Sequence, residues 1–225
     1  MRLARFYPVL DSADWLRRLL PLGVRLVQIR IKDRPRAALM AEIALCRELC
    51  REHGATLVVN DHWREAIELD CDFVHLGQED LDGADIAAIR RAGLRIGIST
   101  HDRAELDRAL ALGPDYVALG PVWPTILKQM KWAPQGLDRL AEWRRLAGAT
   151  PLVAIGGLTP ERGRAALEAG ADAVAAVTDI TLNPDPEARV RHWLEALART
   201  ATPASRPSPG SAPKGRPASP PPMRW

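Results

Sequence analysis

Residues 56–80 read TLVVNDHWREAIELDCDFVHLGQED and contain two short apolar runs, 56–59 and 73–76. Asn60-Asp61 follows the first run, and Glu79-Asp80 closely follows the second. Short apolar runs are typical of buried parallel strands, and parallel α/β folds bind ligands beyond the carboxyl ends of their strands. We therefore expect Asp61 and Asp80 to lie at one ligand-binding edge. Two carboxylates there can share a Mg²⁺ ion with substrate phosphates, which predicts Mg²⁺-assisted chemistry on a phosphorylated small molecule.

The same unit, a short strand followed by an amphipathic helix, repeats about eight times along residues 1–200. The predicted strands are 4–10, 26–30, 56–60, 73–76, 95–98, 116–119, 152–155 and 173–177, and the predicted helices include 37–53, 84–91, 104–112, 137–146, 160–169 and 186–198. Eight such units predict a closed (β/α)8 TIM barrel, an α/β fold, as a single domain over residues 1–200.

The last 25 residues differ from the rest of the chain in composition. Residues 201–225 hold eight of the 19 prolines and four basic side chains with no acidic one. The tail therefore carries a charge of +4, and because the whole chain carries +3, the first 200 residues carry −1. Such a segment cannot bury enough apolar surface to order itself, and we predict a disordered tail. Because the excess basic charge belongs to the tail, the barrel gives no indication of a nucleic-acid partner.

Apolar stretches and cysteines bear on where the protein works. No apolar stretch has the length of a membrane span, and the N-terminus lacks an apolar signal core. Cys46, Cys50 and Cys71 show no CxxC spacing, so we expect buried thiols rather than disulfides or a zinc site. The prediction is a soluble cytoplasmic protein with no membrane partner; a homo-oligomer is left open.

Polar residues follow the second and fifth predicted strands. Gln28, Arg30 and Lys32 alternate along the chain, so we expect them to face the barrel mouth, where two cations and an amide suit a diphosphate. Ser99 would add a neutral hydrogen-bonding group at the rim. Ser99 could instead act only as a helix cap, a role that Thr100 or His101 could also fill.

The loops after the last three strands predict the rest of the mouth. About sixteen residues separate the sixth strand from the next helix, and long loops in compact barrels are usually lids or binding loops. Gly156-Gly157 follows the seventh strand and Val177-Thr178 ends the eighth. Glycines and backbone N–H groups at these two places make the phosphate site common to this fold.

Histidines and tryptophans near these motifs allow other interpretations. His62 and His75 flank the acidic residues, but His75 lies within a predicted strand, so we expect it to be packed or hydrogen bonded rather than to bind metal. His101 lacks an aspartate at a spacing that would suggest a catalytic triad. We expect the tryptophans of these segments, Trp63, Trp123 and Trp132, to be packing or loop-anchoring residues, with substrate stacking open for the latter two.

These segments occur in the same order in thiamine phosphate synthases, and the chain resembles that family over residues 4–198. The motifs that carry the resemblance are YPVLD at 7–11, QxRxK at 28–32, NDHWR at 60–64, HLGQEDL at 75–81, GISTH at 97–101, ALGP at 118–121, PQGL at 134–137 and AIGG at 154–157. The resemblance implies Mg²⁺-dependent joining of 4-amino-2-methyl-5-hydroxymethylpyrimidine diphosphate to hydroxyethylthiazole phosphate. Diphosphate would leave first, giving a pyrimidine carbocation that the thiazole nitrogen captures.

The resemblance also implies roles for individual residues. It implies that Asp61 and Asp80 bind Mg²⁺ and that Lys32, Ser99 and Lys128 assist the reaction. The substrate-binding positions would be Gln28, Ile29, Arg30, Ile31, Lys32, Asn60, Ser99, Thr125, Lys128, Gly157, Val177 and Thr178.

One departure from the family pattern lies in the sixth loop. The family has Pro-Thr-x-Thr-Lys where this chain has PTILK at 124–128, so Leu127 replaces a hydroxyl that would contact the thiazole phosphate. Loss of one such contact costs on the order of 1–3 kcal/mol, which raises KM without preventing the reaction. Two alternatives stay open: a barrel like the thiazole tautomerases, or a catalytically weakened barrel that binds thiamine precursors.

Overall fold

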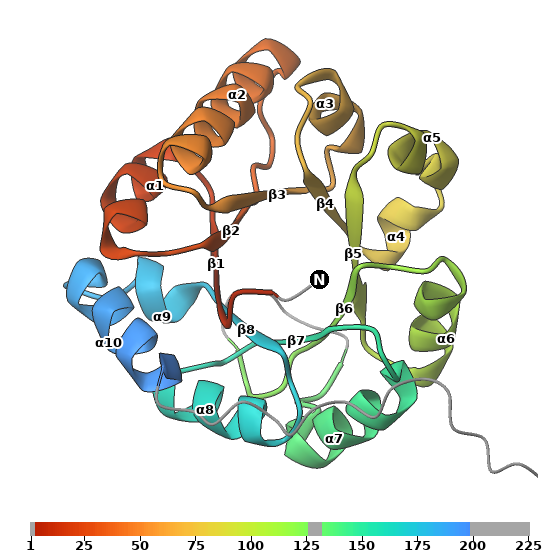
Figure 1. Cartoon of the computed structure of the whole chain (residues 1–225). Helices are drawn as coiled ribbons and strands as arrows, with labels where there is room; N and C mark the ends of the chain where they lie inside the picture. The colour runs from red at the N-terminus through yellow and green to blue at the C-terminus, as the bar shows by residue number, and fades with distance from the viewer. Residues whose placement is uncertain (1–2, 126–131, 199–225) are drawn as a thin grey trace, which may run out of the picture.

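Eight parallel strands form a closed ring in the computed structural model, which describes residues 3–125 and 132–198 (Figure 1). Each strand pairs with the next along the chain, and the last pairs with the first, where Phe6 is in register with Val174. The strands are β1 (Phe6–Leu10), β2 (Leu26–Ile29), β3 (Thr56–Asn60), β4 (Phe73–Leu76), β5 (Arg95–Thr100), β6 (Tyr116–Leu119), β7 (Leu152–Ile155) and β8 (Ala173–Ala176). The predicted (β/α)8 barrel is confirmed.

Helices surround the ring on its outer side (Figure 1). They are α1 (Ala13–Leu19), the 3-10 turn η1 (Leu20–Leu22), α2 (Arg36–Glu52), α3 (Trp63–Glu68), α4 (Gln78–Leu81), α5 (Ile86–Arg91), α6 (Arg103–Ala111), α7 (Gly136–Ala147), α8 (Pro160–Glu168), α9 (Thr178–Thr181) and α10 (Pro186–Ala198). The six helices predicted from periodicity match α2, α5, α6, α7, α8 and α10 to within one or two residues. The short helices α1, α3, α4 and α9 were not among those predicted, although α5, which is also short, was.

Two apolar layers separate the inside of the barrel from its outside. The larger layer lies between strands and helices, and alternate strand residues point into it. The other fills the barrel itself with Leu3, Tyr7, Val9, Leu26, Val58, Phe73, Tyr116, Ala118, Val153, Ala173 and Ala175. The interior is therefore a packed core, and ligands must bind at its ends rather than within it.

The C-terminal helix α10 closes the ring against the first strand. The Trp193 ring stacks on Phe6 with 5.2 Å between centroids, and its Nε1 donates to Asp179 Oδ2 at 2.7 Å. Arg189 makes two further bonds of 2.8 Å to the same carboxylate. Gly163 of α8 leaves room for the indole, since a Cβ there would lie 2.6 Å from it. These contacts join α8, α9 and α10 to β1.

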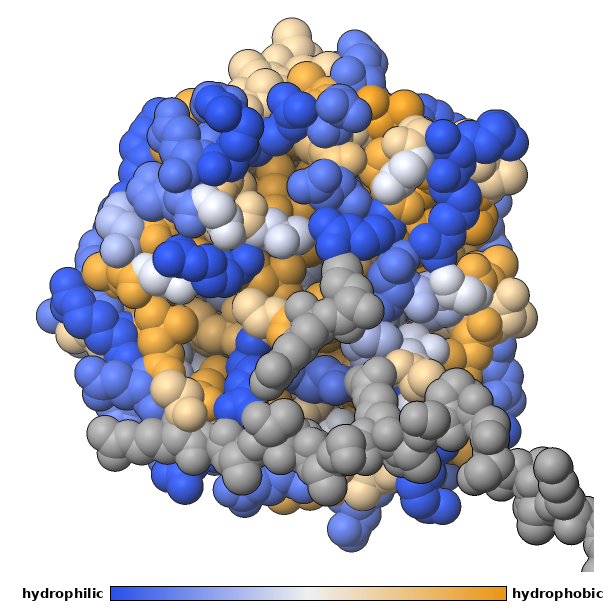
Figure 2. Space-filling model, viewed as in Figure 1, coloured by the Kyte–Doolittle hydropathy of each residue, from blue (hydrophilic) through white to orange (hydrophobic). Residues whose placement is uncertain are grey.

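Charged residues of both signs lie on the outer helices. Figure 2 shows hydrophilic residues over these helices with hydrophobic ones between them, on the face viewed along the barrel. No helix of the described ranges is long and apolar enough to cross a membrane. The predicted tail at 201–225 lies outside the described residues, and the domain boundary and cytoplasmic location stay predictions.

Candidate active site

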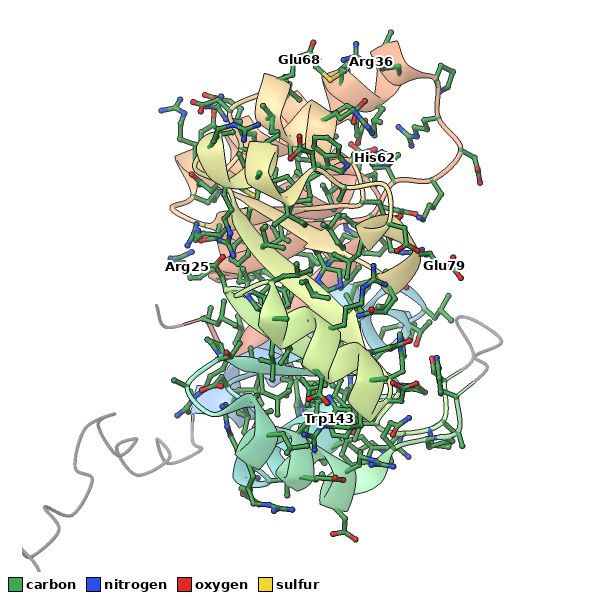
Figure 3. The ribbon with its side chains drawn as sticks, turned by 90° about the vertical axis from the view of Figure 1, so that its right-hand side faces the viewer. Arg25, Arg36, His62, Glu68, Glu79 and Trp143 are labelled. Atoms are coloured by element: carbon green, nitrogen blue, oxygen red, sulfur yellow. The ribbon has the colours of Figure 1, made fainter. Side chains whose placement is uncertain are left out.

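The carboxyl ends of the strands all lie at one end of the barrel. Figure 3 shows Arg25, which precedes β2, at one end and Glu79, which follows β4, at the other. Every described residue proposed for the site comes from the carboxyl end of β2 or a later strand, or from the loop or short helix that follows such a strand. The topology thus brings to one mouth residues that are up to 150 positions apart in the sequence.

Asp61 and Asp80 lie against each other at this mouth. Asp61 follows β3 in a left-handed conformation with φ of 63°, which aspartate tolerates better than most residues, and its N–H donates to His75 O at 2.9 Å. Asp80 lies in the first turn of α4, where Gly77 N–H donates to its Oδ2 at 3.1 Å. Each carboxyl group shifts the pKa of the other, so the two lie close together. The predicted pairing of the two acidic loops is therefore present.

The pKa values of the pair move in opposite directions. Burial alone would raise the pKa of Asp61, but the hydrogen bond and positive charge of Lys32 outweigh burial and hold that pKa below its usual value. Burial and the negative charge of Asp61 both raise the pKa of Asp80. One carboxylate is thus paired with a lysine, while the other carries a negative charge that a cation would stabilise.

The carboxylate pair suits a magnesium ion better than a protein-only metal site. Within residues 3–125 and 132–198, no group of three or more His, Cys, Asp and Glu side chains is arranged to hold a metal. Mg²⁺ usually takes one or two carboxylates and completes its shell with water and substrate phosphates. Asp61 and Asp80 are a donor set of that kind.

The segment after β2 divides as its alternation predicts. The Ile29 and Ile31 side chains are buried in the layer between strands and helices, so only their backbone atoms are available to a ligand. Arg30 and Lys32 are exposed. Gln28 is buried at the edge of the barrel interior, where its Nε2 donates to Tyr7 Oη at 2.9 Å.

Ser99 and Asn60 also occupy the predicted edge. Asn60 is buried at the last position of β3. The Ser99 hydroxyl lies 2.8 Å from His75 Nε2, and the backbone carbonyl of Ser99 accepts a hydrogen bond from Gln78 Nε2 at 2.7 Å. Ser99 is not a helix cap, because Asp102 accepts from Glu105 N–H at the start of α6. The capping interpretation of Ser99, Thr100 and His101 is therefore wrong.

The histidines have structural partners, as predicted for His75. His75 is buried between Tyr116 and Ser99, and burial lowers its pKa to about 4, so the ring is neutral. His62 Nε2 lies 3.0 Å from Ile31 O and joins the loops after β2 and β3. His75 contacts Tyr116 and Gln28 contacts Tyr7, and neither tyrosine was predicted from the sequence as part of the site. The only sequence feature that could have indicated them is a hydroxyl-bearing ring at an inward-facing strand position.

The loop after β6 lies on the loop after β7. Trp123 N–H donates to Gly156 O at 3.1 Å, and a Cβ on Gly157 would lie 2.3 Å from Pro124 O. Gly157, at φ of 62°, is thus required for the close approach of the two loop backbones. The indole of Trp132 stacks on His101 with 5.6 Å between centroids, which supports its predicted role as a loop anchor.

The remaining predicted residues fall into two groups. Thr125 follows Pro124 in the loop after β6, and at the same mouth Val177 lies between β8 and α9 and Thr178 is the first residue of α9. Leu127 and Lys128 lie outside the described residues.

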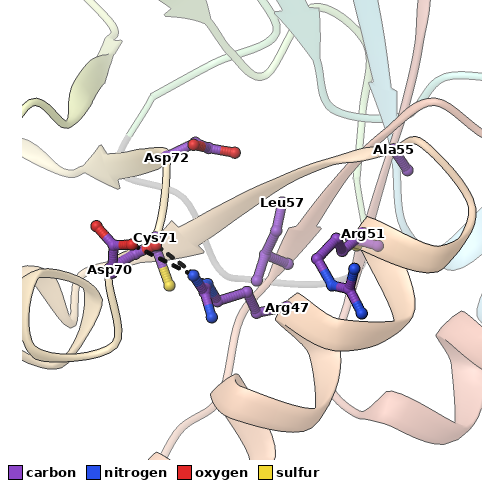
Figure 4. A pocket seen from close by; sticks show the side chains of 8 residues that line it. Arg47, Arg51, Ala55, Leu57, Asp70, Cys71 and Asp72 are labelled. Carbon is purple, nitrogen blue, oxygen red and sulfur yellow. Dashed lines mark hydrogen bonds and ion pairs between the residues drawn. The ribbon is translucent and has the colours of Figure 1, made fainter.

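A separate cavity of about 280 Å³ lies at the opposite end of the barrel (Figure 4). It is lined in part by Arg47, Arg51 and Cys71, near the starts of β3 and β4. Arg47 is bonded there to Asp70 across the cavity wall. Because strand starts in this fold contribute to stability rather than to catalysis, we do not place the active site here.

Comparisons with known proteins agree on one family. Residues 7–180 match the family model described as thiamine monophosphate synthase. The chain is 65% identical over 198 residues to the thiamine-phosphate synthase of Rhizobium etli, covering 88% of this chain and 97% of that one. It is 50% identical over 187 residues to that of Neisseria meningitidis, covering 83% and 91%. The solved thiamine phosphate pyrophosphorylase from Pyrococcus furiosus superposes with a TM-score of 0.78 at 27% identity, covering 87% and 96%.

Proposed function

This chain belongs to the thiamine monophosphate synthase family and is a transferase that makes thiamine phosphate. We propose that its two substrates bind on two arcs of the barrel mouth. The arc after β2 to β5 would hold the pyrimidine diphosphate. The arc after β6 to β8 would hold the thiazole phosphate. The observation that supports this division is the closeness of Asp61, Asp80 and Lys32 in the first arc, two carboxylates and a cation that suit Mg²⁺ and a phosphate.

Asp61 and Asp80 would hold Mg²⁺ on the first arc. When bound, the ion supplies positive charge to the diphosphate as it leaves. Lys32 and Arg30 would add two cations from the neighbouring loop, and Lys128 a third. Asn60 and Gln28 would contact the same substrate from β3 and β2, with the backbone of Ile29 and Ile31 beside them.

The reaction needs no nucleophile from the protein. The bond between the pyrimidine methylene carbon and the diphosphate oxygen breaks, and the electron pair leaves with the oxygen. The thiazole nitrogen then forms the new carbon–nitrogen bond. The protein's task is to stabilise charge on the leaving group, and well-placed donors contribute about 3–4 kcal/mol each to such stabilisation.

The second arc would position the thiazole phosphate. Gly157 lies after β7, and Val177 and Thr178 lie after β8, so the three come from neighbouring strands. Thr125 would contribute from the loop that packs on Gly157. The backbone contact between these loops supports a single shared phosphate site.

The test is a diphosphate-release assay with mass detection of thiamine phosphate, run with Mg²⁺ and with EDTA. We expect product only with Mg²⁺, and a loss of about 100-fold or more in kcat/KM for Asp61→Asn and for Asp80→Asn. Asparagine keeps the size of the side chain and tolerates the left-handed conformation of residue 61. The variants therefore remove charge with little change in backbone strain.

Asp70→Asn is the matched control. Asp70 is also left-handed, with φ of 50°, but it is exposed at the opposite end of the barrel. Near-normal Mg²⁺-dependent rates in both mouth variants would refute the metal assignment. If the unmodified protein released diphosphate but formed no thiamine phosphate, the second arc would be the part that fails to position the thiazole phosphate.

A further inference from the structure

Five polar side chains form one continuous hydrogen-bonded chain across the end of the barrel interior. The heavy-atom distances are 2.9 Å from Gln28 Nε2 to Tyr7 Oη, 2.9 Å from Tyr7 Oη to Tyr116 Oη, 2.7 Å from Tyr116 Oη to His75 Nδ1, and 2.8 Å from His75 Nε2 to Ser99 Oγ. Each residue comes from a different strand: β2, β1, β6, β4 and β5. We call these five residues the interior relay. Its two ends, Gln28 and Ser99, are both residues of the proposed pyrimidine arc.

With the Gln28 amide oriented as in the structure, one direction of the relay leaves every proton bonded. Gln28 donates to Tyr7, so the Tyr7 hydroxyl must donate to its other partner, Tyr116. Tyr116 then donates to Nδ1 of His75. The neutral imidazole carries its single proton on Nε2 and donates it to Ser99, which leaves the Ser99 hydroxyl free to donate elsewhere.

The opposite direction requires the Gln28 amide to turn over. If Ser99 donated to His75, the bonds would reverse as far as Tyr7, whose own proton would find an acceptor only if Gln28 presented Oε1 in place of Nε2. Among the described side chains, Gln28 and Tyr116 are the polar partners of Tyr7. With Nε2 of Gln28 toward Tyr7, the reversed chain would leave a buried donor unsatisfied at a cost in free energy, so this amide orientation selects the first direction.

Packing holds the relay in one geometry. The Tyr116 and His75 rings stack with 5.5 Å between centroids and 14° between planes. Gly97 of β5 provides the space for Tyr116, since a Cβ there would lie 2.1 Å from the ring. The chain's two tyrosines are both in the relay and both fully buried. Neither can turn its hydroxyl away without breaking bonds on both sides.

We propose that Tyr7, Tyr116 and His75 are positioning residues that fix Ser99 as a hydrogen-bond donor toward the substrate. His75 would hold the Nε2–H tautomer, and the Ser99 proton would point into the barrel mouth. The role of Ser99 toward the pyrimidine substrate rests on the proposed function. The direction of the relay does not, because it follows from contacts within the protein.

The first test reads the tautomer of His75 directly. We would label the five histidines with ¹⁵N, assign His75 by the signal lost in His75→Gln, and record ring nitrogen shifts of the unliganded protein near pH 8. We expect a protonated Nε2 and an unprotonated Nδ1. A protonated Nδ1 would overturn the relay direction, whether or not the protein makes thiamine phosphate.

The second test measures coupling between Tyr116 and Ser99. Tyr116→Phe removes one hydroxyl and should lower kcat/KM about two- to tenfold, the range that one hydrogen bond is worth. In a Ser99→Ala background the same change should have less than a twofold effect, because Tyr116 acts through Ser99. A purely structural role predicts equal losses in both backgrounds, and that result would overturn the proposal. If Tyr116→Phe does not fold, the tautomer measurement still decides.

Discussion

Gly97→Ala should destabilise the protein strongly, although alanine is ordinarily the better residue in a strand interior. The added Cβ would lie 2.1 Å from Tyr116 Cζ and 2.5 Å from its Oη, so the ring must retreat by about 1 Å inside a packed barrel. Overpacking of this kind costs about 1–3 kcal/mol. Disturbing the two hydrogen bonds of the Tyr116 hydroxyl adds about 1–3 kcal/mol.

Together these costs predict a loss of about 2–6 kcal/mol in the free energy of unfolding, or about 5–20 °C in Tm for a domain of this size. Urea titration and thermal unfolding by circular dichroism would measure the change. Gly83→Ala is the control, because the nearest atom to its added Cβ is 4.0 Å away; it should change stability by less than about 0.5 kcal/mol. In a Tyr116→Leu background, Gly97→Ala should cost less. A Gly97→Ala protein as stable as the unmodified chain would refute this reasoning.

Three further predictions concern other parts of the structure. Lys32→Met should raise the pKa of Asp61 in the folded protein. The charged Asp61 carboxylate stabilises the fold above its unfolded pKa, so in this variant that stability should be lost at a higher pH during acidification. Urea unfolding midpoints measured between pH 6 and pH 3 would show the change. Iodoacetamide at pH 8 should modify none of the three cysteines before unfolding, because they are buried and burial raises the thiol pKa of Cys50 to about 12; mass spectrometry before and after urea gives the count. Asp179→Ala should cost about 3 kcal/mol of unfolding free energy in urea titration, because it removes three hydrogen bonds and leaves the Arg189 guanidinium unpaired.

The barrel could be predicted because each of its units is encoded locally. A strand such as 116–119 is a short apolar run, and a helix such as α2 is long enough to show its period. The carboxylate pair could be predicted for the same reason, since parallel topology places consecutive strand ends side by side. That rule alone was enough to predict that Asp61 and Asp80 lie close together.

The interior relay could not be predicted in this way. Tyr7 and Tyr116 are 109 positions apart, and each resembles an ordinary aromatic core residue of a strand. Their contact depends on closure of the barrel, and on Gly97 leaving space for a ring on β6. Likewise, nothing in Gly156-Gly157 alone indicates that the loop after β6 packs on it.

Closure of the ring between β1 and β8 has a consequence for synthesis of the protein. One edge of β1 remains unpaired until Ala173–Ala176 has been translated, and the stack of Phe6 on Trp193 forms later still. At about 5–20 residues per second, the ribosome needs roughly 10–30 seconds to make the intervening chain. During that interval Phe6–Leu10 is a nascent strand with exposed backbone groups, the kind of edge that pairs with other chains. In the cell, protection of this strand edge depends on what binds the emerging polypeptide before β8 can pair with β1.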